Sequence, residues 1–123
     1  MASGKETFSF KKRIQSFGYA FRGLRDLFIY EHNAWIHLIA AVCAVALGFV
    51  FKISVSEWIA LCVVIGFVFS MEIVNSAIEK LADAVDSQKN EKIRLVKDLS
   101  AAAVLVSAII SVIVGLLIFL PKI

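Results

Sequence analysis

Three long and largely apolar stretches constrain this chain more than any other feature. They cover residues 34–51, 57–79 and 99–120, and as helices each would measure about 27 to 35 Å at a rise of 1.5 Å per residue. The hydrocarbon core of a bilayer is about 30 Å thick. Hydrophobic residues make up 60% of the chain, whereas a soluble domain contains about 45–50%. The sequence therefore predicts an all-α integral membrane protein with three transmembrane helices, forming one domain over residues 1–123.

Residues 8–30 carry a different pattern, in which apolar residues recur at intervals of three and four. This spacing places them on one face of a helix, and they are Phe10, Ile14, Phe17, Phe21, Leu24 and Phe28. Most of the basic residues in this segment lie off that face. A basic helix with a phenylalanine-rich face is typical of a membrane interface. We therefore expect an amphipathic surface helix ahead of the first span.

The basic residues are unevenly distributed between the two sides of the expected membrane domain. Eleven of the thirteen lie before the first span or between the second and third spans, and the other two are Lys52 and Lys122. Basic residues favour the cytoplasmic side. We therefore expect a cytoplasmic N-terminus and a cytoplasmic connector over residues 80–98. The net charge of +3 is too small to indicate nucleic acid as a partner, and we expect none.

Polar residues share one face at the cytoplasmic end of the second span. They are Glu72, Asn75, Glu79, Asp83 and Asp86, spaced by three or four residues as one helix face requires. Two carboxylates and an amide on one face within a membrane span indicate a functional site.

The depth of Glu72 strengthens that interpretation. If Trp58 marks the outer interface, Glu72 lies about 21 Å further along the helix and within the hydrocarbon. An ionisable residue at that depth is costly unless it faces protein or a wet cavity. A structural alternative is that a protonated Glu72 and Asn75 form hydrogen bonds between helices.

Other charged residues are expected at the same level of the membrane. Glu31 precedes the first span, and Lys97 and Asp98 open the third, where Asp98 could also be a helix N-cap. Mg²⁺ binds oxygen ligands and is commonly shared between one or two carboxylates and substrate phosphates. The chain contains no P-loop and no kinase-type glycine-rich loop, so we expect an unconventional nucleotide site.

Two histidines precede or begin the first span. His32 and His37 are five residues apart, which is out of register for two ligands on one helix face. We expect them to anchor the interface or to form hydrogen bonds rather than to bind a metal.

The acidic face has the pattern of a known enzyme family. The segment E-I-V-N-S-A-I-E from Glu72 to Glu79, followed by Asp83 and by Lys97-Asp98, resembles the signature of the prokaryotic diacylglycerol kinase family. The resemblance covers nearly the whole chain, from about Lys11 to Leu120. It implies a homotrimer of three-span subunits in the bacterial inner membrane. It also implies Mg²⁺-dependent transfer of the ATP γ-phosphate to the hydroxyl of a lipid alcohol.

A second motif indicates a branch of that family. Glu31-His-Asn33 followed by His37 resembles the pattern of the undecaprenol kinase branch. Undecaprenol is therefore the expected acceptor, and diacylglycerol is the alternative. A reading from another class is a small cation or proton transporter, but the outer half of each span is largely apolar. A purely structural scaffold would leave the buried Glu72 unexplained.

The resemblance also implies roles for individual residues. Glu72 would be the catalytic base, Asn75 would orient the site, and Glu31 and Glu79 would bind the metal. The residues implied to contact the nucleotide, besides those two metal ligands, are Lys12, Tyr19, Asp83, Lys97 and Asp98. In many relatives the second connector carries an acidic-Tyr-His segment, and here the corresponding residues are Gln88-Lys89-Asn90.

Overall fold

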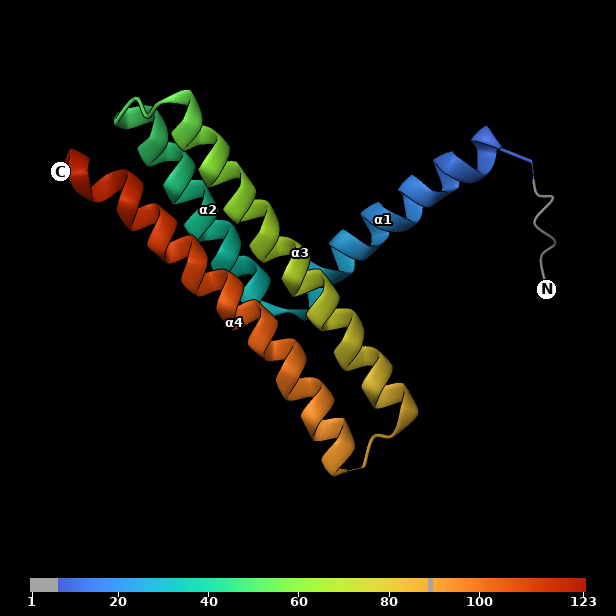
Figure 1. Ribbon diagram of the computed structural model, residues 1–123. Helices are drawn as coiled ribbons and strands as arrows, with labels where there is room; N and C mark the ends of the chain where they lie inside the picture. Colours follow the sequence, from blue (N-terminus) through green and yellow to red (C-terminus); the bar gives the residue numbers. More distant parts are fainter. Residues whose placement is uncertain (1–6, 89) are drawn as a thin grey trace.

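The computed structural model describes residues 7–88 and 90–123, so that Lys89 of the second connector lies outside the described residues. The described part folds into the helices α1 (Phe10–Tyr30), α2 (His32–Val50), α3 (Val55–Val85) and α4 (Glu91–Phe119), followed by a 3-10 turn, η1 (Leu120–Lys122) (Figure 1). Helices α2, α3 and α4 are long and apolar enough to cross a membrane. This confirms the predicted all-α architecture, with three helices that are long and apolar enough to span a membrane.

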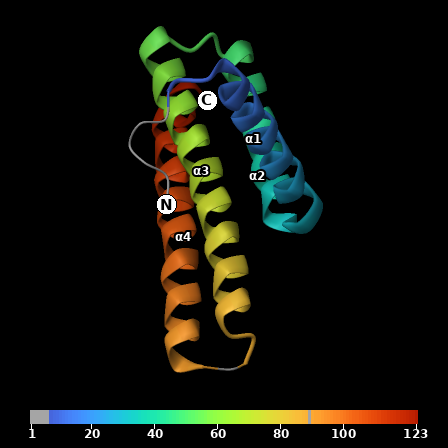
Figure 2. The same ribbon diagram turned by 90° about the vertical axis from the view of Figure 1, so that its right-hand side faces the viewer.

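Helices α3 and α4 form the most extensive contact of the molecule and run antiparallel along most of their length (Figure 2). Two small residues of α4, Ser100 and Ser107, are buried. The Ser107 hydroxyl donates to the carbonyl of Val104, 2.7 Å away, so its burial leaves no unpaired donor. Small residues allow helices to approach closely in lipid, where packing rather than water exclusion holds helices together.

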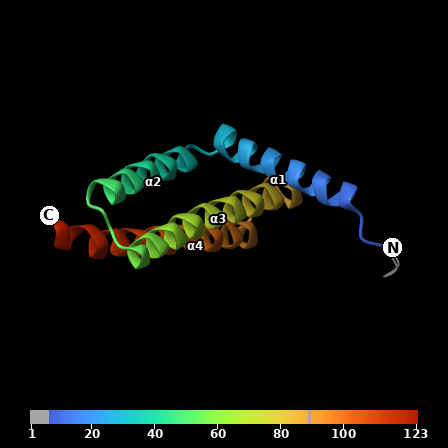
Figure 3. The same ribbon diagram turned by 90° about the horizontal axis from the view of Figure 1, so that it is seen from above.

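Helix α2 is shorter than its neighbours and lies against only part of α3. Helix α1 leaves the bundle where α2 begins, beside the middle of α3, and most of its length projects outward (Figures 1 and 3). Its C-terminal turn is the part that packs, through the buried Leu27. The start of α2 therefore meets α1 and α3 at one level of the bundle.

The turn between α2 and α3 is tight. Lys52 has a positive φ of 52°, and α3 already begins at Val55. The Ser54 hydroxyl accepts from the backbone of Glu57 at 3.2 Å, and Glu57 accepts from the backbone of Ser54 at 2.9 Å. This capping box satisfies backbone donors that the first turn of a helix leaves unpaired.

The connector predicted over residues 80–98 is mostly helical, because α3 continues to Val85 and α4 begins at Glu91. The segment contains no glycine or proline that would break a helix. Lys97 of α4 and Asp83 of α3 form an ion pair at 2.5 Å across the two helices. Hydropathy reports where a helix leaves the hydrocarbon, whereas these helices persist beyond it.

Two details follow from the longer helices. The N-cap of α4 is Asn90, whose side chain accepts from the backbone of Lys92 at 2.8 Å, so Asp98 is not the N-cap. Lys97 and Asp98 lie inside α4 and do not open it. Asp86 is the C-cap of α3, in an extended conformation, and therefore does not continue the acidic helix face.

The α2–α3 turn and the C-terminus lie at one end of the bundle, and the α3–α4 turn lies at the other (Figure 1). Lys122 and Glu57 form an ion pair at 2.8 Å at the first of these ends. Behind it, the buried Ile53, Leu61 and Ile118 form an apolar cluster. This arrangement agrees with the relative sidedness that the basic residues predict.

Candidate active site

Glu72 is the most deeply buried charged residue that the structure describes. Its side chain extends from α3, and the residue is 2% exposed. Its Oε1 lies 2.9 Å from Nε2 of His37 on α2. Apart from this contact, Oε1 has no hydrogen-bond partner in the described part of the chain. A buried carboxyl oxygen with so few partners is costly in a stable interior. Glu72 is thus a candidate to accept a hydrogen bond from a bound ligand.

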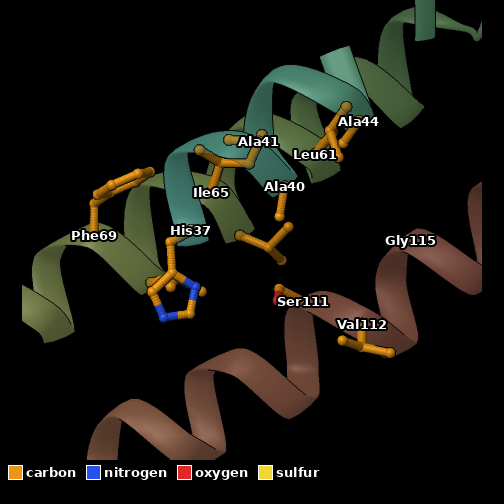
Figure 4. A pocket seen from close by; sticks show the side chains of 12 residues that line it. His37, Ala40, Ala41, Ala44, Leu61, Ile65, Phe69, Ser111, Val112 and Gly115 are labelled. Carbon is orange, nitrogen blue, oxygen red and sulfur yellow. The ribbon is translucent and has the colours of Figure 1, made fainter. Parts of the chain in front are cut away.

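An apolar cavity of about 160 Å³ lies between α2, α3 and α4 (Figure 4). His37 and Phe69 lie together at one end of it, and Gly115 of α4 lies on the opposite wall. The α2 wall consists of small side chains, those of Ala40, Ala41 and Ala44. Such a lining accepts hydrocarbon and offers few polar partners. Because His37 lines this cavity and also contacts Glu72, it connects the apolar space with the buried carboxyl group.

Aromatic side chains fix the level at which α1, α2 and α3 meet. The centroid of the Phe28 ring lies 5.2 Å from that of the Trp35 ring and 6.2 Å from that of the Phe69 ring. The Trp35 indole N–H also donates to the Phe28 carbonyl at 2.7 Å. Aromatic pairs of this kind combine large buried area with preferred geometry. They hold the α1–α2 junction against α3 beside Glu72.

Glu31 occupies that junction, where it is the C-cap of α1 and the N-cap of α2. The Ser76 hydroxyl of α3 donates to Glu31 Oε1 at 3.0 Å. The Lys80 ammonium lies 3.6 Å from the same oxygen. Both contacts engage Oε1. The fold therefore brings Glu31 to the α3 face that also carries Glu72 and Glu79.

Asn75 lies on the side of α3 that faces α4. The Ser100 hydroxyl donates to Asn75 Oδ1 at 2.5 Å, and Ser100 itself is buried. This bond ties the two long helices together one turn from Glu72. It also fixes Asn75 Oδ1 as the acceptor, which leaves its amide N–H groups as possible donors.

Beyond this level, charged residues of α3 and α4 form a polar surface. Lys97 pairs with Asp83 at 2.5 Å and also interacts electrostatically with Glu79. Asp98 pairs with Arg94. A hollow of about 570 Å³ is lined by residues of the α3–α4 turn and the start of α4, including Arg94, Lys97 and Asp98.

Two of the predicted nucleotide contacts lie apart from this group. Lys12 and Tyr19 belong to the part of α1 that projects from the bundle. Tyr19 is 62% exposed, and the guanidinium of Arg22 lies over its ring at 5.7 Å. A single chain does not bring these two residues to Glu72.

Comparison with known proteins identifies the enzyme family of this chain. The family model described as prokaryotic diacylglycerol kinase matches residues 18–119. The chain belongs to this family. It is therefore an ATP-dependent lipid kinase, as the motif predicts, and membership favours this reading of the acidic face over that of a transporter.

Three relatives show how far the similarity to this kinase extends. It is 39% identical to the undecaprenol kinase of Bacillus subtilis (strain 168) over 109 residues, which are 89% of each chain. It is 32% identical to the diacylglycerol kinase of Escherichia coli (strain K12) over 107 residues, covering 87% of this chain and 88% of the relative. It is 30% identical to the diacylglycerol kinase of Synechocystis sp. (strain ATCC 27184 / PCC 6803 / Kazusa), covering 88% of this chain and 62% of the relative.

The kinase's residues can be compared with what a magnesium ion requires. No group of three or more histidine, cysteine, aspartate or glutamate side chains is arranged to hold a metal among residues 7–88 and 90–123. Glu31 nevertheless contacts the face of α3 that carries Glu79. Glu31 accepts a hydrogen bond from Ser76, and Ser76 and Glu79 are neighbours on that face. Two carboxylates suffice when substrate phosphates supply the remaining ligands. These residues fit a metal that arrives with its nucleotide.

Sequence reasoning missed four residues that organise the site of the kinase: His37 as the partner of Glu72, Ser76 and Lys80 as partners of Glu31, and Ser100 as the partner of Asn75. A hydrogen-bonding role was expected for His37, but its partner was not. Ser76 could have been found, since it follows Glu72 by four residues and lies on the same face. Nothing in the sequence reveals the partners on other helices.

Proposed function

We propose that this kinase transfers the γ-phosphate of ATP to the hydroxyl of undecaprenol, with Glu72 as the general base. The observation that carries the proposal is the buried Oε1 of Glu72, which has no hydrogen-bond partner in the described part of the chain. His37, which contacts this oxygen, also lines the apolar cavity. A lipid alcohol matches both features, because it brings a hydrocarbon chain and one hydroxyl donor.

The reaction is a transfer of the γ-phosphoryl group from ATP to the lipid hydroxyl. The lipid hydroxyl oxygen forms a bond to the γ-phosphorus, and its proton passes to Oε1 of Glu72. The bond between the γ-phosphorus and the β–γ bridging oxygen breaks, and ADP leaves with that electron pair. Phosphoryl transfer depends mainly on positioning and charge stabilisation, with a residue that accepts the hydroxyl proton.

Glu31 and Glu79 are the residues proposed to hold Mg²⁺. A bound Mg²⁺ would neutralise charge on the phosphates. On this chain, Ser76 holds Glu31 in place, and Lys97 is the cation next to Asp83 and Glu79. We propose that Asn75 orients the reacting groups through its amide N–H, since Ser100 already occupies its Oδ1.

We propose that Lys97, Asp98 and Asp83 contact ATP from the α3–α4 surface, and that Lys12 and Tyr19 contact it from α1. Helix α1 carries the last two away from their own bundle (Figure 1). In the proposed homotrimer with shared sites, a neighbouring subunit would bring an α1 to each bundle. Exposed apolar side chains along α2 and α4 leave ample surface for such contacts in lipid.

The proposed setting is the bacterial inner membrane, with the N-terminus in the cytoplasm and the whole chain acting as one domain. Helix α1 would lie in the cytoplasmic interface, where its exposed Phe10, Phe17 and Phe21 reach the acyl boundary. The charged ends of α3 and α4 would extend past the headgroups. This placement puts Glu72 within the hydrocarbon and the Lys97–Asp83 pair in water, where MgATP arrives.

The acceptor is tested by direct competition. The relative at 39% identity is named an undecaprenol kinase, whereas those at 32% identity are named diacylglycerol kinases. Purified protein in mixed micelles is given γ-labelled ATP with equal mole fractions of undecaprenol and diacylglycerol, and the two products are separated. We expect label mainly in undecaprenyl phosphate. Preferential labelling of diacylglycerol would overturn the choice of acceptor, and absence of label in both lipids would overturn the proposed function.

A further inference from the structure

We propose that His37 is the positioning residue for Glu72, and that its imidazole keeps Oε1 directed at the incoming lipid hydroxyl. This inference rests on the proposed function of Glu72 as the base. The carrying observation is the 2.9 Å separation between His37 Nε2 and Glu72 Oε1, which joins α2 to α3. The His37 and Glu72 side chains are 22% and 3% exposed, so solvent screens their interaction little.

A base on a long flexible side chain needs an external constraint. The Glu72 side chain has three rotatable bonds, and α3 fixes only its backbone. A misplacement of about 1 Å in a reacting group can cost about 10²-fold in rate. A partner on a different helix fixes the position of the carboxyl group relative to the space between α2 and α3. Contacts within Glu72's own helix cannot do this.

His37 is itself supported by an aromatic neighbour. Its ring and that of Phe69 of α3 pack in a T-shaped arrangement, with ring centroids 6.5 Å apart. Phe69 in turn packs against Phe28 of α1. The imidazole is thus supported by the same aromatic group that fixes the α1–α2 junction, and this is the condition under which a positioning residue can hold another side chain.

The cavity lies on the side of His37 from which the lipid is proposed to approach. His37 lies at the end of the apolar space between α2, α3 and α4 (Figure 4). An alcohol whose chain fills that space brings its hydroxyl to His37 and the adjoining Glu72 oxygen. Because Oε1 has no hydrogen-bond partner among the described residues, it can accept the hydroxyl proton while the imidazole remains beside it.

A purely structural ion pair is the competing explanation of the same contact. Such a pair would stabilise the fold, and its removal would lower the amount of folded enzyme rather than the turnover of each folded molecule. Breaking a buried pair leaves one group without its partner and is destabilising. The experiment must therefore separate kcat from stability.

The test compares His37→Leu with His37→Gln in the full-length enzyme in micelles. Leucine removes the ring nitrogen that lies beside Oε1, whereas glutamine retains an N–H that can reach the carboxyl group. We expect His37→Leu to lower kcat by about 10²-fold with little change in KM for MgATP, and His37→Gln to recover part of the loss. Cys43→Leu, at an exposed position further along α2, is the control and should keep kcat within about twofold, as a surface substitution away from the site should.

Thermal unfolding and size-exclusion profiles of each variant accompany the kinetics. The proposal is overturned if folded His37→Leu keeps kcat near that of the parent, or if leucine and glutamine lower kcat equally. It is also overturned if kcat falls only in proportion to the folded fraction. If leucine prevents folding, His37→Gln alone decides. A lower kcat per folded molecule supports the proposal, and a kcat equal to that of the parent overturns it.

A combined variant separates this inference from the function on which it rests. Residues that act as one unit show non-additive losses, so adding His37→Leu to Glu72→Gln should cause no further fall in kcat. A Glu72→Gln enzyme with normal turnover would overturn the proposed base itself. A severe loss in Glu72→Gln together with full activity in His37→Leu would overturn only the role of His37.

Discussion

Ser76 of α3 donates a hydrogen bond of 3.0 Å to Glu31 at the junction of α1 and α2. The two residues are 45 positions apart in sequence, and their contact brings a carboxylate from outside the spans to the acidic face of α3. Lys80 supports the same Glu31 oxygen from one turn further along. Glu31 is therefore fixed at the level of Ser76, which lies between Glu72 and Glu79 along α3, although its own neighbours in sequence belong to two different helices.

This position of Glu31 gives a prediction for Glu79. Glu79→Gln keeps the shape of the side chain but removes the charge that Mg²⁺ requires. We expect a strong loss of MgATP-dependent turnover and a rise in the Mg²⁺ concentration needed for half-maximal rate, with little change in KM for lipid. The measurement is a Mg²⁺ titration at fixed ATP in micelles.

Glu57→Gln is the control for that titration. Glu57 pairs with Lys122 at the opposite end of the bundle, so its loss should leave the Mg²⁺ dependence unchanged. If Glu79→Gln turns over normally with the Mg²⁺ dependence of the parent, Glu79 is not a metal ligand.

The second prediction concerns Glu72 itself. Glu72→Gln preserves volume and hydrogen-bonding capacity but cannot accept a proton, and loss of a general base costs about 10²–10⁴-fold in rate. Because a neutral amide is less costly to bury than a charged carboxylate, the variant should remain folded and bind nucleotide. Turnover and nucleotide binding are measured on the same preparation. Lipid phosphorylation within about tenfold of the parent rate would exclude base catalysis by this residue.

The third prediction concerns orientation in the membrane. In a background with Cys43 and Cys62 replaced by alanine, a single cysteine is introduced at Ser56 or at Ser87. Basic residues favour the cytoplasmic side, so an impermeant thiol reagent applied to intact cells should label Ser56→Cys, in the first turn of α3. Ser87→Cys should react only after the cells are opened. The opposite labelling pattern would reverse the proposed topology.

The fourth prediction concerns packing at the end of the bundle opposite the site. A Cβ atom added to Gly48 would lie 2.6 Å from the Trp58 ring, so Gly48→Ala should destabilise the protein by about 1–3 kcal/mol, as overpacking does. Gly66→Ala is the control, because nothing lies within 4 Å of its added Cβ and alanine favours a helix. Melting temperatures in detergent compare the two. Equal stability of both variants would show that Trp58 yields without cost.

Local properties of the chain determined the helices and the chemical class. Long apolar runs must form helices in lipid, because backbone groups there need partners within the segment. The predicted spans fall within α2, α3 and α4, apart from Phe51 after α2 and Leu120 after α4. A helix is observed over Phe10–Tyr30, within the predicted residues 8–30, and its place at the membrane surface stays a prediction. The spacing of Glu72, Asn75 and Glu79 placed them on one face and indicated the kinase family before any tertiary contact was known.

Only the tertiary structure decided which side chains complete that face. His37 meets Glu72, and Ser100 meets Asn75, because α2 and α4 take particular axial positions against α3. Helical periodicity specifies a face of one helix but not how far a neighbouring helix slides along it. The sequence also did not predict that α3 continues beyond residue 79 or that α4 begins before residue 99. Hydropathy measures transfer into lipid, whereas these helix ends are stabilised by capping and by the Lys97–Asp83 pair.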